Sequence, residues 1–115
     1  MGLGMQIVYV GLPGLAAIEA QAGVQLLRLG RFNAMLSECR LVVQLLPTSG
    51  QAPGYGARLE LFCARHEFDS VHRCEGADLG VALIAVFEAA ERDLAARMGR
   101  AVYRDARPRH ATEKQ

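Results

Sequence analysis

The segment QIVYVGLPGLAAIEAQAGVQLLRL, residues 6–29, changes its hydrophobic period part way along, and this change decides the fold. Residues 6–12 are β-branched and aromatic and are followed by Pro13-Gly14, which predicts a strand that ends in a turn. Beyond the turn, apolar residues recur every three or four positions, which predicts a helix with one apolar face. That face comprises Leu15, Ile18, Ala22, Leu26 and Leu29, and Gln21, Gln25 and Arg28 are expected to point outward.

Three more strands and a second helix follow. The continuously apolar residues 39–46 predict a central strand, residues 57–66 alternate as a strand does, and residues 70–75 predict a short partner strand. Asp78 is a typical N-cap, and the helix after it is expected to end near residues 99–103. The order β-α-β-β-β-α predicts an α+β two-layer sandwich, in which two helices pack on one face of a four-stranded mixed sheet. The first two strands are expected to be parallel and the others antiparallel.

Length and charge predict one domain with a distinct C-terminus. The chain has 115 residues, 51% of them hydrophobic, which suits a single globular domain over residues 1–100. Residues 100–115 carry a formal charge of +3 and the other residues −2, so residues 101–115 are expected to form a basic, flexible tail. No secretory leader or bilayer-length apolar run is visible, which predicts a cytoplasmic protein with no membrane partner.

Neither a metal site nor a catalytic site is predicted. Cys63-x-x-His66 and His72-x-Cys74 would bring two cysteines together across a two-residue turn, but Cys63 and His66 point to opposite faces of a strand. Cys39 lies on the central strand, where burial makes a thiol inert. The acids Glu88, Glu91 and Asp93 alternate with Arg92, which is typical of a solvated helix face. We therefore expect a protein that is not an enzyme, with no metal, cofactor or small-molecule substrate.

Arginines are the main candidates for binding, because two helices on one sheet face lie side by side and their outer sides can form a groove. Arginine contacts phosphate through charge-assisted, often bidentate hydrogen bonds. The candidate RNA-binding residues are Arg28 and Arg31 on the first helix, Arg92, Arg97 and Arg100 on the second, and Arg104, Arg107 and Arg109 beyond it. Solvated surface arginines are the alternative. Phe62 on the open sheet face and Tyr55 in a loop are candidates to stack on a base, or surface aromatics that a dimer partner covers.

Several of these segments resemble a known family. The run Cys74-Glu75-Gly76-Ala77-Asp78-Leu79-Gly80-Val81-Ala82-Leu83 is similar to the strand end and last-helix start of ribosome hibernation-promoting factors and ribosome-associated inhibitors, the sigma-54 modulation proteins. Residues 18–29 and the strand 39–46 resemble the first helix and second strand of that family. The resemblance covers residues 6–100 and corresponds to a short form, without the dimerising extension of longer members.

The resemblance implies a ribosome-associated factor of stationary phase and stress. Such proteins bind small-subunit rRNA with basic residues of the two helices and occlude the channel for mRNA and tRNA. That role would fall to Arg28, Arg92, Arg97 and Arg100. Ala89 and Ala96 replace common lysines, and Gly80 replaces a frequent aromatic residue. With the acidic body and Phe62, these departures favour an alternative, a diverged homodimerising or protein-interaction module on the same fold.

Overall fold

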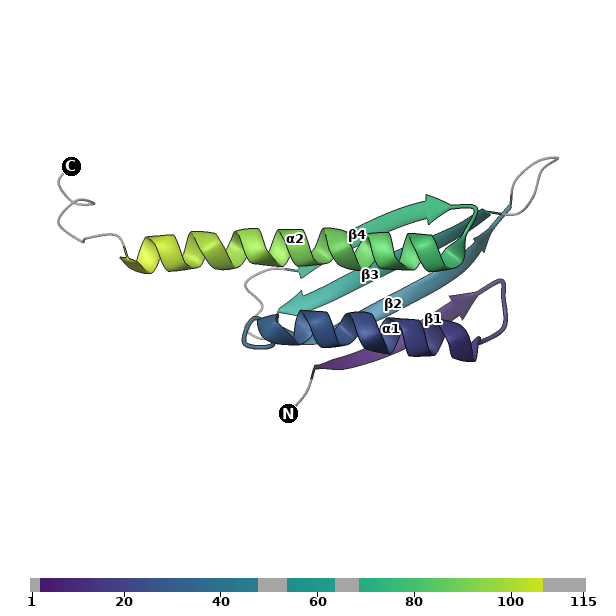
Figure 1. Cartoon of the computed structure of the whole chain (residues 1–115), viewed down its shortest axis with the longest axis horizontal. Helices are drawn as coiled ribbons and strands as arrows, with labels where there is room; N and C mark the ends of the chain where they lie inside the picture. Colours follow the sequence, from purple (N-terminus) through teal and green to yellow (C-terminus); the bar gives the residue numbers. More distant parts are fainter. Residues whose placement is uncertain (1–2, 48–53, 64–68, 107–115) are drawn as a thin grey trace.

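A computed structural model describes residues 3–47, 54–63 and 69–106, with the side chains of the last helix described through Gly99. The strands and helices follow one another in the predicted order, β-α-β-β-β-α (Figure 1). The elements are β1 (Gly4–Val10), α1 (Ala16–Leu29), a 3-10 turn (Gly30–Phe32), β2 (Leu36–Leu46), β3 (Gly54–Cys63), β4 (Asp69–Gly76) and α2 (Leu79–Ala106).

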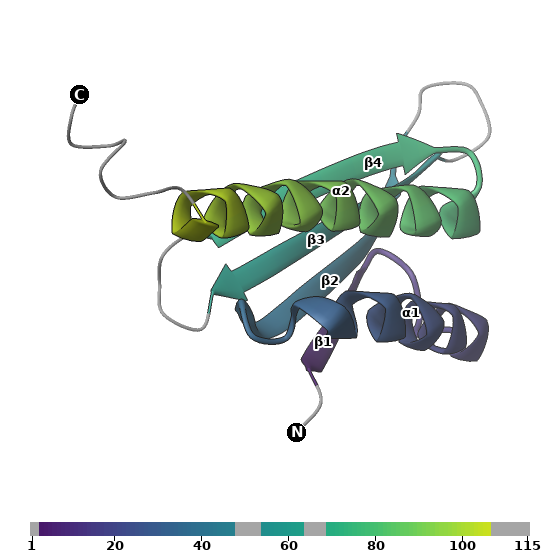
Figure 2. The same ribbon diagram turned by 60° about the vertical axis from the view of Figure 1, so that its left-hand side comes forward.

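The four strands form one sheet in the order β1-β2-β3-β4. β1 pairs with β2 in parallel, because α1 carries the chain back across the sheet, and the two later pairings are antiparallel. Both helices lie on the same face of the sheet and run side by side in the same direction (Figures 1 and 2). The predicted α+β two-layer sandwich with a mixed sheet is therefore confirmed.

Most of the predicted apolar positions are buried in the core between the two layers. Alternate residues of β3 are buried, and so is the apolar stripe of α2. The side chains that are fully covered include Phe32, Leu41, Val43, Leu59, Leu61, Leu83, Val86, Phe87 and Leu94. On α1 the pattern is rotated from the prediction: Gln25, expected outward, is only 9% exposed, whereas Leu15, expected inward, is the N-cap residue and 40% exposed.

Several element boundaries differ from the sequence prediction, beginning with β1, which covers Gly4–Val10 rather than residues 6–12. β3 covers Gly54–Cys63 rather than residues 57–66, because the long β2 offers pairing partners as far as Leu46, which pairs with Gly54. β2 begins at Leu36, directly after the 3-10 turn, rather than at residue 39. α2 continues through Gly99 to Ala106, since one glycine costs a helix only about 1 kcal/mol and the next proline is Pro108. Residues 107–115 lie outside the described residues, and a flexible tail there stays a prediction.

The beginning of α2 matches its prediction and fixes the helix beside α1. The Asp78 carboxylate Oδ1 accepts a hydrogen bond from the backbone N–H of Val81 at 3.1 Å, as an N-cap does. One turn along, α2 approaches α1 closely: a Cβ on Gly80 would lie 3.3 Å from Gln21 Oε1. A larger side chain at this position would therefore have to displace the Gln21 side chain of α1.

Candidate nucleic-acid interface

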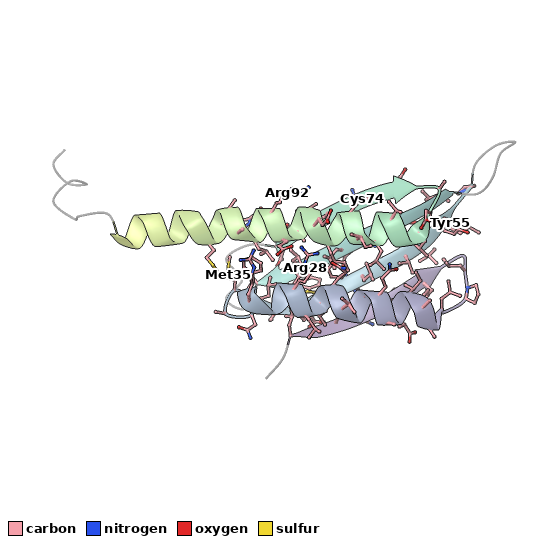
Figure 3. The ribbon with its side chains drawn as sticks, in the orientation of Figure 1. Arg28, Met35, Tyr55, Cys74 and Arg92 are labelled. Atoms are coloured by element: carbon pink, nitrogen blue, oxygen red, sulfur yellow. The ribbon has the colours of Figure 1, made fainter. Side chains whose placement is uncertain are left out.

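A groove runs between α1 and α2 on the side that faces away from the sheet. It encloses about 390 Å³ and is lined by Arg28, Arg31, Glu88, Glu91, Arg92 and Ala95. Arg28 and Arg31 come from α1 and the 3-10 turn after it. On α2, Glu91 and Arg92 are adjacent, with Glu88 one turn before them and Ala95 one turn after. Figure 3 shows Arg28 in the space between the helices. The structure thus brings three of the predicted arginines together.

Glu91 joins the two walls of this groove. Its Oε1 lies 2.8 Å from Nη2 of Arg28, and its Oε2 lies 3.4 Å from Nη2 of Arg31. The sequence prediction that Glu91 belongs to a solvated face is wrong, because its side chain faces α1 and is only 22% exposed. Nη1 of Arg28 also donates to Oε1 of Gln25 at 3.3 Å, which gives the buried Gln25 side chain a partner. Arg31 lies over the ring of Phe32, 4.4 Å from its centroid.

Arg92 is the available cation of the groove. It is exposed, and in the part of the chain that the structure describes it takes part in no ion pair. Glu88 lies one turn earlier on the same helix face, but the i, i+4 pair that this spacing suggests does not form between the two. A guanidinium without a carboxylate partner keeps its N–H groups for an external anion.

Arg97, by contrast, lies on the other flank of α2 and does not join the groove. Its Nε donates to Oδ1 of Asp93 at 3.2 Å. The second carboxylate oxygen, Oδ2 of Asp93, accepts from the Ser70 hydroxyl at 3.0 Å and lies 3.2 Å from Nε2 of His72. Ser70 and His72 belong to β4, so Asp93 connects α2 to the sheet rather than facing solvent as predicted. The side chain of Arg97 is accordingly 33% exposed, and its guanidinium is already paired with Asp93.

The Ser70, His72 and Asp93 contacts are not those of a hydrolytic triad. The Ser70 hydroxyl and the Asp93 carboxylate both contact the same ring nitrogen, Nε2 of His72, at 2.9 and 3.2 Å. In a serine–histidine–aspartate triad the nucleophile and the acid use different ring nitrogens, which allows the imidazole to move a proton between them. The cluster is therefore arranged to hold α2 against β4.

The acid–base behaviour of this cluster gives a testable result. Burial alone would raise the pKa of Asp93, but the Ser70 hydrogen bond and the charges of Arg97 and His72 lower it below its ordinary value. A carboxyl whose folded pKa is depressed contributes stability above its unfolded pKa of about 4, and that contribution disappears as pH falls through the folded pKa. We expect Asp93→Asn to melt at a lower temperature than the wild type at pH 7, with the difference shrinking below about pH 4.

Melting curves of both proteins between pH 7 and pH 3, followed by circular dichroism, check this expectation. Glu88→Gln is the matched control, since Glu88 is exposed on the same helix, and its difference from the wild type is expected to stay small throughout. A difference between Asp93→Asn and the wild type that is constant with pH would contradict the assignment.

The cysteines do not converge. Cys74 pairs with Ala57 across β3 and β4, whereas Cys63 pairs with Leu36 of β2 at the far end of β3. In the described part of the chain, no three His, Cys, Asp or Glu side chains are placed to hold a metal, and His66 lies outside the described residues. Burial raises the pKa of the Cys39 thiol to about 12, with a further contribution from the charge of Glu38. Cys39 therefore remains a protonated core residue, as predicted.

The two aromatic candidates differ in their surroundings. Phe62 lies on the open face of the sheet, where Arg40 stands over its ring at 5.6 Å and pairs with Glu60 at 2.6 Å. One face of the ring is thus already in contact with a cation. Tyr55 belongs to β3 and packs against the core, so its prediction as a loop residue is wrong.

The remaining predicted arginines lie beyond the described side chains. Arg100 and Arg104 belong to the backbone of α2, and Arg107 and Arg109 are outside the described residues. Their roles stay predictions. The sequence analysis also missed three exposed apolar side chains on the helices, Val24 at 58%, Leu27 at 81% and Val81 at 65%. The sequence does indicate this for Val24, which lies one turn before Arg28 at a position outside the predicted apolar stripe.

Comparison with solved structures finds the same fold in two proteins. A ribosomal subunit interface protein from Coxiella burnetii superposes with a TM-score of 0.70 at 10% identity, covering 84% of this chain and 99% of that one. The N-terminal domain of Protein Y from Thermus thermophilus gives a TM-score of 0.64 at 20% identity, covering 82% and 96%. These neighbours agree with the family resemblance of the sequence, and at these identities they show a shared fold.

No protein-family model matches the sequence, and comparison with curated proteins finds no match either. Within the residues that the structure describes, neither helix combines the length and hydrophobicity that crossing a membrane requires.

Proposed function

We propose that this protein associates with the ribosome in the cytoplasm and acts there as a hibernation factor in stationary phase and stress. The observation that carries the proposal is the groove, in which Arg28, Arg31 and Arg92 converge between the two helices. The fold around this groove is shared with a ribosomal subunit interface protein. Arginines from two parallel helices are suited to follow the phosphates of an RNA backbone.

The mechanism we propose is steric. The groove arginines contact phosphates of small-subunit rRNA, and the body of the domain then fills the channel that mRNA and tRNA would use. This mechanism needs neither a cofactor nor a covalent step, and its energy comes from charge-assisted contacts that release counterions. Binding is therefore expected to weaken steeply as salt concentration rises.

A sucrose gradient of a stationary-phase lysate, probed for this protein, tests the proposal. We expect the protein to migrate with 30S or 70S particles at low salt and to leave them when the gradient contains high salt, because phosphate contacts are lost as cations compete. A protein that stays at the top of a low-salt gradient, in lysate and after addition to purified 30S subunits, would contradict it.

A second candidate function, a homodimerising or protein-interaction module, is favoured by the exposed side chains of Val24, Leu27 and Val81. Val24, Arg28 and Arg31 follow one another at helical spacing, so the exposed Val24 borders the groove. Apolar side chains that gather on a surface are typical of protein contacts rather than of RNA contacts. A soluble complex at the top of the gradient, with twice the monomer mass by light scattering, would support this function instead.

A further inference from the structure

Glu91 occupies the place in the groove that a phosphate would take. Its carboxylate spans both α1-side arginines, with one oxygen 2.8 Å from Arg28 and the other 3.4 Å from Arg31. The side chain of Glu91 is 22% exposed, against 47% for Arg28 and 58% for Arg31. The carboxylate thus lies below the two guanidinium groups, on the floor of the groove, while the cations reach toward solvent.

Arg28 already uses two of its five N–H donors in this arrangement. Its Nη2 pairs with Glu91, and its Nη1 donates to Gln25 at 3.3 Å. A phosphate that accepts two parallel hydrogen bonds from an arginine needs two neighbouring N–H groups of the same fork. A bidentate phosphate contact at the Nη1–Nη2 fork of Arg28 therefore competes with the contacts that Arg28 makes to Glu91 and Gln25.

Arg92, on the α2 wall of the groove, differs from Arg28 in its lack of a carboxylate partner among the described residues. It follows Glu91 in the chain, is exposed, and forms no ion pair within the part of the chain that the structure describes. A single phosphate that reaches Arg92 also meets the neighbouring negative charge of Glu91, which repels it. Only a ligand that brings several phosphates can replace Glu91 on Arg28 and Arg31 as well as contact Arg92.

We propose that Glu91 is an internal competitor for the ligand and that the groove consequently selects a polyphosphate backbone, such as RNA, over a mononucleotide or a free phosphate. This inference rests on the proposed function and adds to it a carboxylate that limits which ligands the groove binds. RNA binding exchanges two internal ion pairs for contacts with successive phosphates, so the carboxylate lowers the affinity of the groove for every anion and penalises small anions most.

The experiment compares the wild type with Glu91→Gln, and with Glu88→Gln as the matched control. Both acids line the groove on α2, and the two substitutions change the net charge equally, but only Glu91 pairs with arginines. Affinity for purified 30S subunits is measured by fluorescence anisotropy of labelled protein across a series of NaCl concentrations. Glu91→Ala is included because it removes the carboxylate without leaving an amide that hydrogen-bonds to Arg28.

We expect Glu91→Gln and Glu91→Ala to bind 30S subunits about fivefold more tightly than the wild type at low salt, which is the repulsion between unit charges about 4 Å apart in water. The slope of log affinity against log salt should stay close to that of the wild type, because the same arginines contact phosphates in both proteins. Glu88→Gln should give a smaller gain and leave the slope unchanged. Combining Glu91→Gln with Arg28→Gln should abolish the gain in affinity, because the arginine that Glu91 releases is then absent.

The outcomes separate the two proposals. Wild-type binding with no more gain for Glu91→Gln than for Glu88→Gln overturns the competitor role and leaves the proposed function standing. Weaker binding by Glu91→Gln and Glu91→Ala also overturns that role, since it shows that Glu91 positions the arginines for the ligand. Binding by none of the proteins at the lowest salt overturns both proposals together. Inhibition of wild-type binding by AMP as strong as by a short RNA of equal phosphate concentration overturns the selectivity for a backbone.

Discussion

Reversing two charges in the groove, with Arg28→Glu and Arg92→Glu in one protein, is expected to abolish migration with 30S subunits. Each substitution removes a charge-assisted contact worth about 1.5 to 3 kcal/mol and adds a repulsion. Two such losses correspond to at least about a hundredfold weaker binding. Neither side chain belongs to the core, but Arg28→Glu also places a carboxylate beside Glu91, so circular dichroism is used to verify that the double variant is folded.

Arg73→Glu provides the control for this double variant. Arg73 is an exposed arginine on β4, and its register opposite Arg58 places it on the face of the sheet that the helices do not cover. Its reversal is expected to leave sedimentation with 30S subunits nearly unchanged. Retained binding by the double variant would move the contact surface elsewhere, and the open sheet face around Phe62 would be the next surface to test.

Truncation of the core gives the largest expected effect on stability. Phe87 of α2 is 2% exposed and belongs to the central apolar cluster, so Phe87→Ala is expected to lower the free energy of unfolding by about 3 to 5 kcal/mol. That is a large part of the 5 to 15 kcal/mol that stabilises an ordinary domain, so we expect the variant to be partly unfolded at 37 °C. Urea unfolding followed by circular dichroism measures the difference.

Val81→Ala tests whether this loss comes from the core. Val81 lies on the same helix but is 65% exposed, and its truncation is expected to change the free energy of unfolding by less than about 0.5 kcal/mol. Equal losses for Val81→Ala and Phe87→Ala would contradict the packing described above.

The fold could be predicted from the sequence because its signals are local. The change of period near Leu15, the alternation through Leu59 and Leu61, and the cap at Asp78 each fix one element without reference to the others. Boundaries that depend on a partner could not be predicted in this way. β3 begins at Gly54 only because β2 extends to Leu46, and a glycine seldom indicates a strand by itself.

The site could be predicted in part for the same reason. That two helices share one sheet face places Arg28 and Arg92 beside one groove, and the structure confirms this placement. The rotation of each helix about its own axis is not contained in a repeat of apolar residues, since a buried stripe leaves two flanks that look alike. The positions expected for Arg97 and Glu91 are consequently both wrong. Arg97 pairs with Asp93 on the flank of α2 that faces β4, and Glu91 faces α1.

The length of α2 has a consequence for local unfolding. The helix spans Leu79–Ala106, and its C-terminal end extends past the sheet and past α1 (Figure 1). Among its side chains described through Gly99, the last fully buried one is Leu94. Backbone hydrogen bonds open with a free energy that reflects the tertiary packing around them, so amides on one continuous helix need not share one protection factor. Hydrogen exchange of the amides near Leu83 is governed by opening of the whole domain. Beyond Met98, the last described side chain of α2 that packs against the core, exchange is expected to follow the helix–coil equilibrium of the projecting turns, so the two ends of α2 are expected to belong to different cooperative units.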